Sequence, residues 1–140
     1  MYTHILSSKL ETEQRKDLVK KIILFFCKEC KYLKIRCWAQ DDADAPFLKK
    51  QTVQRTFGDD GLLELRVPID KEVVDFFNHY EMSETESYIL PFFHLEFLDE
   101  QKNVQLYCGD SGSDVLFDEA TFNAPQLFDL ISEEHFNKLN

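Results

Sequence analysis

The chain has 140 residues, of which 44% are hydrophobic, including 13 Phe, five Tyr and one Trp, and its formal net charge is −10. This length and composition predict one packed domain over residues 1–140 and exclude extensive disorder. The acidic balance argues against binding to nucleic acid or to an anionic membrane, because phosphate groups are recognised by basic surfaces.

A helical pattern runs from Lys9 to about Lys34. Its apolar residues recur at the spacing of one helix face, and lysines occupy the opposite side. The apolar stripe consists of Val19, Ile22, Ile23, Phe26, Cys30 and Leu33. We therefore predict an amphipathic helix that docks on the core. The following segment, Lys34 to Ala39, alternates apolar and polar residues, which predicts a half-buried strand with Trp38 on its polar face.

The middle of the chain predicts a hairpin and a short helix. Two strands are expected at Gln51–Phe57 and Leu62–Val67, joined by Gly58-Asp59-Asp60-Gly61. Glycines that flank two Asp residues are typical of such turns. Asp70 is expected to cap a short helix. The inward face of that helix would consist of Val73, Phe76, Phe77 and Tyr80.

The second half predicts a meander followed by short helices. After a polar break at Ser83 to Ser87, strands are expected at Phe92–Leu98, Val104–Cys108 and Val115–Phe117. Asn123 and Ser132 are expected to cap helices over Leu127–Ile131 and Glu133–Leu139. The whole order predicts an α+β fold, with a mostly antiparallel sheet of about five or six strands and the helices packed on it.

Two short motifs contain residue types found in redox, metal or catalytic sites. Cys27-Lys-Glu-Cys30 has the spacing of redox and zinc sites, but it falls late in a helix, where the local field disfavours a thiolate. Buried core cysteines are the preferred interpretation, with a metal site as the alternative. Gly109-Asp110-Ser111-Gly112-Ser113 is similar to the nucleophile segment of chymotrypsin-like proteases, but the remainder of that family's pattern is missing from the sequence, so we interpret it as a turn.

The charges divide the chain into two parts. The first 57 residues carry 12 basic and 7 acidic side chains, a net +5, whereas the remainder carries 4 basic and 19 acidic ones, a net −15. Many of these carboxylates fall in predicted turns, where they would attract a basic protein partner. The partner-binding residues that we predict are Asp110, Asp114, Asp118 and Glu119, with Trp38 as an aromatic anchor. We assign no catalytic residue, metal site or cofactor.

The chain is acidic, and its predicted strand–turn–strand from His94 ends in Cys108-Gly-Asp. In both features it resembles immunity proteins of bacterial polymorphic-toxin and contact-dependent growth inhibition systems. This resemblance implies a cytoplasmic inhibitor that binds a cognate toxin domain, often a nuclease, and occludes its active site. It transfers no individual residue. Two alternatives stay open: a small regulatory or adaptor domain, and an unrecognised hydrolase that uses His94 and Glu96, which share one strand face. The sequence contains no apolar run near the roughly 20 residues that cross a bilayer, and we expect no membrane contact.

Overall fold

The computed structural model describes residues 1–38, 47, 54–58, 61–81, 90, 92 and 94–139. Its strands are β1 (His4–Leu6), β2 (Tyr32–Cys37), β3 (Gln54–Phe57), β4 (Leu63–Pro68), β5 (His94–Leu98), β6 (Val104–Gly109), β7 (Asp114–Phe117) and β8 (Phe136–Lys138). Its helices are α1 (Thr12–Glu29), α2 (Lys71–His79) and α3 (Ala124–Leu130), together with the 3-10 turns η3 (Asp110–Gly112) and η4 (Glu133–His135).

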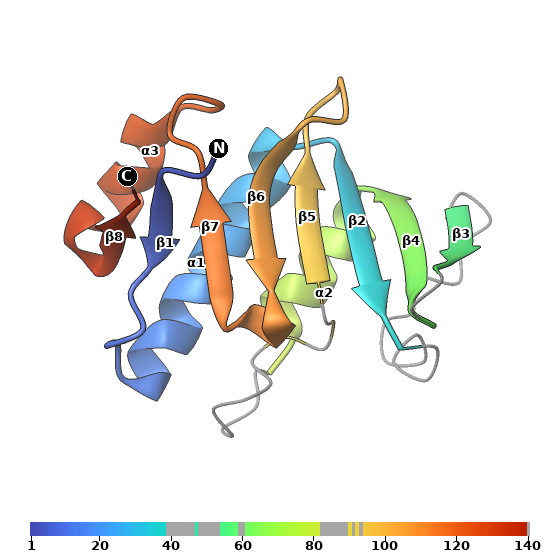
Figure 1. Cartoon of the computed structure of the whole chain (residues 1–140), viewed down its shortest axis with the longest axis horizontal. Helices are drawn as coiled ribbons and strands as arrows, with labels where there is room; N and C mark the ends of the chain where they lie inside the picture. Colours follow the sequence, from blue (N-terminus) through green and yellow to red (C-terminus); the bar gives the residue numbers. More distant parts are fainter. Residues whose placement is uncertain are drawn as a thin grey trace.

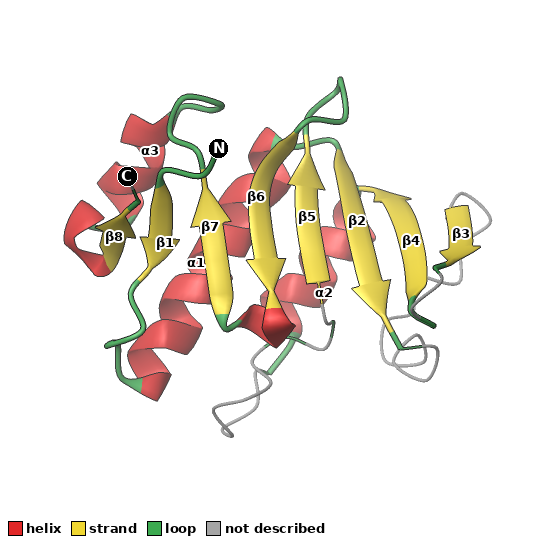
Figure 2. Ribbon diagram, viewed as in Figure 1, coloured by secondary structure: helices red, strands yellow, loops and turns green. Residues whose placement is uncertain are grey.

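The strands form one sheet in the order β3-β4-β2-β5-β6-β7-β1-β8, and every pair of neighbours is antiparallel. The three α-helices lie together behind this sheet in Figure 1, so the described part of the chain has two layers. Figure 2 shows the same arrangement, with the sheet in front and the helices on its far face. The fold is therefore α+β, as predicted.

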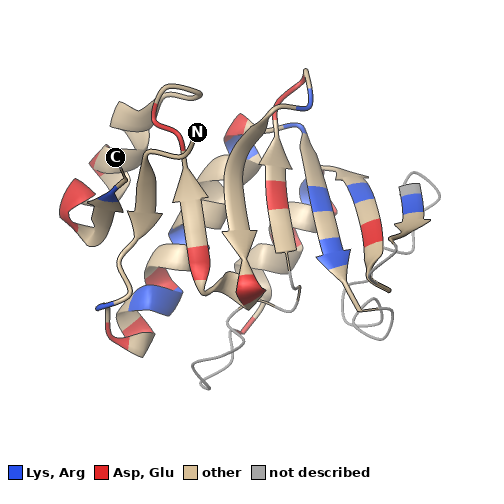
Figure 3. Cartoon of the chain, in the orientation of Figure 1, with Lys and Arg blue, Asp and Glu red and all other residues tan. Residues whose placement is uncertain are grey.

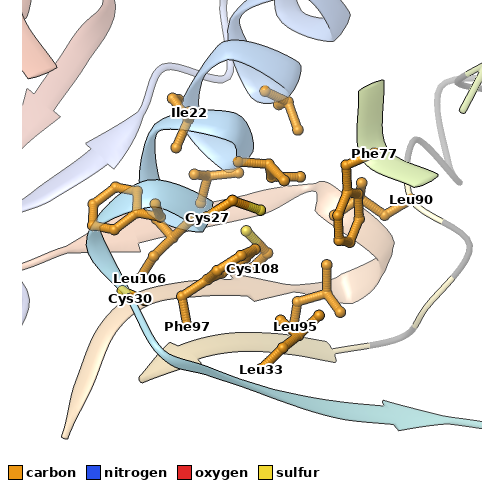
Figure 4. Close-up of a cluster of buried hydrophobic side chains, with 14 of the residues drawn as sticks. Ile22, Cys27, Cys30, Leu33, Phe77, Leu90, Leu95, Phe97, Leu106 and Cys108 are labelled. Carbon is orange, nitrogen blue, oxygen red and sulfur yellow. The ribbon is translucent and has the colours of Figure 1, made fainter. Parts of the chain in front are cut away.

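The core lies between the helices and the inward face of the sheet. Phe26 of α1 and Phe97 of β5 are both fully buried, and their ring centroids are 6.5 Å apart. Figure 4 shows side chains of α1 and of the central strands meeting from the two layers. Burying a large apolar side chain contributes about 1.5–3 kcal/mol. Side chains of β2, β5, β6 and β7 with at most 1% exposure are Leu33, Ile35, Cys37, Leu95, Phe97, Leu106, Cys108, Val115 and Phe117.

The start of α2 agrees with the prediction, whereas α1 is shorter than predicted. The side chain of Asp70 accepts hydrogen bonds from the backbone N–H groups of Glu72 and Val73, at 3.0 and 3.2 Å, so this residue caps α2 as expected. The first helix ends at Glu29, several residues before its predicted end. Alternation of apolar and polar residues in β2 already begins at Tyr32, and this places Leu33 in the sheet rather than in the helix stripe.

The sheet has eight strands, so the prediction of about five or six was wrong. The additional strands are β1 and β8, which pair with each other and are only three residues long. The helix predicted over Glu133–Leu139 is replaced by the 3-10 turn η4 and by β8, because Phe136 is buried against Phe117, with ring centroids 5.2 Å apart. This long-range packing outweighs a weak local helix signal. Neither Asn123 nor Ser132 forms the predicted side-chain cap.

Several predicted segments fall partly outside the described residues. These include Ala39, Gln51 to Val53, Asp59 and Asp60, Ser83 to Ser87, and Phe93. The flanks of the predicted hairpin are described, and β3 pairs with β4 in antiparallel register. Within the described residues, no helix is both long and apolar enough to pass through a membrane.

Candidate functional site: the open face of the sheet

The candidate site is the sheet face that points away from the helices, which we call the open face. Residues on it alternate along each strand with the buried core residues, and most of them are only partly buried. Its side chains include Ile5, Tyr32, Lys34, Arg36, Glu64, Arg66, His94, Glu96, Leu98, Val104, Tyr107, Asp114 and Leu116. A sheet face with this mixture of charged and aromatic side chains is unlike the buried face of the same strands.

Charge is distributed unevenly over the open face. Basic side chains gather on β2 and β4, and acidic ones lie on β5 and at the start of β7 (Figure 3). The ammonium of Lys34 lies 3.4 Å from the carboxylate of Glu64, so part of the basic half is compensated by a neighbouring strand. The open face therefore has a mixed half over β2 and β4 and an acidic border near the connection between β6 and β7.

An aromatic cluster occupies the middle of the open face. The ring centroids of Tyr2 and Tyr107 are 6.0 Å apart, and the ring of His94 meets that of Tyr107 nearly at a right angle, with centroids 5.5 Å apart. Nδ1 of His94 lies 3.4 Å from the hydroxyl oxygen of Tyr107. Glu96 is the register partner of Tyr107 on β5. The cluster thus brings the N-terminal segment beside residues from the central strands.

The electrostatics of this cluster favour uncharged rings. Burial raises the pKa of Tyr107, and the carboxylates of Asp114 and Glu96 raise it further. Burial, followed by Glu96, also raises the pKa of Tyr2. Burial lowers the pKa of His94, and the positive charge of Arg36 adds to that effect. At neutral pH we therefore expect two neutral phenols and a neutral imidazole.

The predicted acid–base pair lies in this cluster. Nδ1 of His94 is within hydrogen-bonding distance of the phenol of Tyr107, whose raised pKa makes that phenol a weak nucleophile. Glu96 follows His94 by two positions on one strand face, as predicted. The hydrolase alternative stays a prediction.

The predicted partner-binding residues fall into two groups. Asp110 begins η3 and Asp114 begins β7, so both lie at the connection between β6 and β7. Asp118 and Glu119 follow the other end of β7, and Figure 3 shows acidic segments at both ends of this strand. The four carboxylates therefore do not form one patch.

Trp38 lies at the same end of the sheet as the first of these groups, with β5 and β6 between them. It follows the last residue of β2 and is 47% exposed. Because Arg36 is the register partner of His94, the end of β2 adjoins the start of β5, and the β6–β7 connection lies at this same end of the sheet. The structure thus brings Trp38, Asp110 and Asp114 to one end of the sheet, which we call the acidic end.

Asp118 has a structural role in its turn. Its carboxylate accepts a hydrogen bond from the N–H of Ala120 at 3.0 Å, and its carbonyl oxygen accepts one from the hydroxyl of Thr121 at 2.8 Å. The N–H of Glu119 donates to the hydroxyl of Thr3 at 2.9 Å, which ties the turn to the N-terminal segment. These contacts give Asp118 a structural role, and its predicted role in partner binding stays a prediction.

Arg15 supports the acidic end from the helix layer. Its guanidinium donates hydrogen bonds to the carbonyl oxygens of Gly112, at 3.2 Å, and Ser113. Burial lowers the pKa of Arg15, and the negative charge of Asp114 opposes this shift. The sequence analysis missed this role because residues 15 and 112 become neighbours only in the folded chain.

The cysteines belong to the core. All four are buried and reduced, and burial raises the pKa of Cys27, Cys30 and Cys108 to about 12. Thiols of this kind are poor nucleophiles at neutral pH. Across the described ranges, no group of three or more His, Cys, Asp or Glu side chains is placed to hold a metal ion.

Two shallow depressions lie in the helix layer. One has a volume of about 330 Å³ and is lined by Lys21, Leu24, Phe25, Lys28 and Leu130. The other has a volume of about 310 Å³ and is lined by Phe47, Glu72, Asp75 and Phe76. Neither contains the predicted site residues.

Comparisons of this chain with protein-family models, with curated proteins and with solved structures find no match. The functional inference therefore depends on the geometry of the open face and on the charges around it.

Proposed function

We propose that this protein is a stoichiometric inhibitor that binds a basic protein, in the manner of immunity proteins that neutralise a cognate toxin domain. The observation that carries the proposal is the acidic end of the open face, where Asp110, Asp114 and Trp38 lie at the same end of the sheet beside a surface of aromatic and charged side chains. Such a surface favours recognition of another protein over turnover of a small molecule.

The dimensions of the sheet suit a protein partner. Eight strands spaced at about 4.8 Å give a sheet about 34 Å wide, and its strands of three to six residues are about 10–20 Å long. The resulting area, about 600 Å², is about three quarters of the roughly 800 Å² that each partner buries in a standard interface. The open face can thus supply most of the area of a specific interface.

Charge supplies the preference for a basic partner. The net charge of −10 attracts basic proteins at long range, and the carboxylates of the acidic end would orient them. If the partner is a nuclease, these carboxylates would occupy the place of substrate phosphates. Inhibition then follows from steric blockade, and the mechanism requires no cofactor.

The adaptor alternative uses the same surface. Lys34, Arg36 and Arg66 give the β2 and β4 half a basic character, which would suit a partner with charges of both signs. The two functions differ in the nature of the partner. An inhibitor has a partner that is toxic when it is expressed alone, whereas an adaptor does not.

The test is capture of the partner from the native cell with the intact chain as bait, at low and at moderate salt, followed by mass spectrometry. We expect one basic protein in equimolar amount, with more recovered at low salt because exposed charges are screened as salt rises. Expression of that protein alone should stop growth, and co-expression of this chain should restore it. A partner that is harmless alone would favour the adaptor, and the absence of any partner at either salt would refute both.

A further inference from the structure

We propose that Tyr2, Tyr107, Glu96 and Asp114 form a binding site for one cationic side chain of the partner, with arginine as the best fit. We call these four residues the tyrosine site. This inference builds on the proposed function, because it names the chemical group that the open face would recognise on a basic protein.

The ring of Tyr107 is held in a defined position. It lies near the ring of Tyr2 and meets the ring of His94 nearly at a right angle. A Cβ atom added to Gly109 would lie 2.5 Å from the hydroxyl oxygen of Tyr107 and 2.7 Å from two of its ring carbons. The phenol therefore lies directly against the backbone of Gly109, and a larger residue there would displace it.

Carboxylates flank the Tyr107 ring on both neighbouring strands. Glu96 of β5 is in register with Tyr107, and Asp114 of β7 is in register with Gly109, over which the ring lies. The ion pairs formed within the described residues include neither of these carboxylates. Burial raises the pKa of Tyr107, and both carboxylates raise it further, in agreement with their register positions beside it.

Aromatic rings beside carboxylates attract cations through the ring face and through charge. This chain already uses the first interaction elsewhere on the sheet, where Nζ of Lys102 lies 5.8 Å from the ring centroid of Tyr32. Among the described residues, no Lys or Arg lies over the ring of Tyr2 or Tyr107. A planar guanidinium can stack on a ring and donate to a carboxylate at the same time, which favours arginine over lysine.

The direction of approach follows from the surrounding charges. Arg36 lies on the β2 side of the cluster. Its positive charge lowers the pKa of Tyr107, whereas the carboxylates raise it. Asp110 and Asp114 lie on the β7 side, at the acidic end. A cationic side chain would therefore approach from the β7 side.

The test is an NMR titration of the intact chain with the peptide acetyl-Ala-Arg-Ala-amide, with acetyl-Ala-citrulline-Ala-amide as the uncharged control. We expect saturable shifts of the Tyr2 and Tyr107 ring protons, and an affinity for the arginine peptide about fivefold higher than for the citrulline peptide. Equal affinities, or the absence of saturable ring shifts, would overturn the proposal.

Matched variants distinguish binding at the tyrosine site from general attraction to an acidic protein. Asp114→Asn and Glu96→Gln should each weaken arginine-peptide binding, whereas Asp129→Asn, on the exposed surface of α3, should leave it unchanged. A loss of the same size in Asp129→Asn would overturn the proposal. Gly109→Ala should displace the Tyr107 ring and weaken binding, and Tyr107→Leu tests the same ring if the alanine variant does not fold.

The titration needs no natural partner, so the two proposals can fail separately. Arginine-peptide binding without any captured partner would support the tyrosine site and refute the proposed function. A captured toxic partner whose affinity is unchanged by Tyr107→Leu would support the function and overturn the tyrosine site.

Discussion

The two faces of the sheet are built from the same strands but differ in burial and in residue type. On the helix-covered face, Leu95, Phe97 and Cys108 have at most 1% exposure and fill the core. On the open face, Glu96 and Tyr107 stand one position away along the same strands and remain partly exposed. Core residues and candidate binding residues therefore alternate along each strand, because successive side chains point to opposite faces.

Adjacent substitutions in β5 give the largest expected contrast between the two faces. Phe97→Ala should lower the free energy of unfolding by about 3–5 kcal/mol, because it leaves a cavity in a closely packed core. Glu96→Ala, one position away, should change it by less than about 1 kcal/mol. Urea unfolding followed by circular dichroism measures both. Equal losses would show that the open face also stabilises the fold.

High pH tests the covered face in a different way. The pKa of the Cys108 thiol is raised from 9.0 to about 12 by burial, so between these values the unfolded chain releases a proton that the folded chain retains. Stability should be unaffected by this thiol below pH 9 and should then fall as pH rises, by up to about 1.4 kcal/mol per pH unit.

The control for this prediction is the Cys108→Ala variant. Its unfolding free energy should depend less steeply on pH between 9 and 12 than that of the unmodified chain, although it is less stable overall. Urea midpoints at intervals of half a pH unit would measure the difference. The same slope for both proteins would contradict a buried, protonated thiol at this position.

The smallest expected effect concerns an ion pair on the open face. The side chains of Lys34 and Glu64 are 24% and 30% exposed and their charged atoms are 3.4 Å apart. Such pairs contribute about 0.2–1 kcal/mol, so Glu64→Gln should cost no more than that. The loss should shrink as salt is added, and a loss above 2 kcal/mol would mean that this pair is part of the stabilising structure.

Local sequence patterns predicted the elements that bury one face in the core and expose the other. Alternation located β5, β6 and β7 to within two residues, and Asp70 identified the start of α2, because these signals lie within short stretches of sequence. β1 and β8 gave no comparable signal. Each has three residues, and each becomes a strand only by pairing with a segment far away in the chain.

The candidate site was only partly predictable for the same reason. The sequence identified Asp110, Asp114 and Trp38, which the structure places at one end of the sheet. It could not show that Asp118 and Glu119 lie at the other end of β7, because this depends on the direction of each strand. It also could not bring Tyr2 beside Tyr107, since that contact requires β1 to lie next to β7.

The central claim is that the acidic end of the open face recognises a basic partner. Its most direct test is the association rate with the captured partner at low salt, for two double variants that have the same net charge. Asp110→Asn with Asp114→Asn removes charge from the acidic end, whereas Asp75→Asn with Asp129→Asn removes it from the exposed surface of α2 and α3. We predict that the first pair slows association about tenfold and flattens its salt dependence, while the second has little effect. Equal slowing by both pairs would contradict the claim.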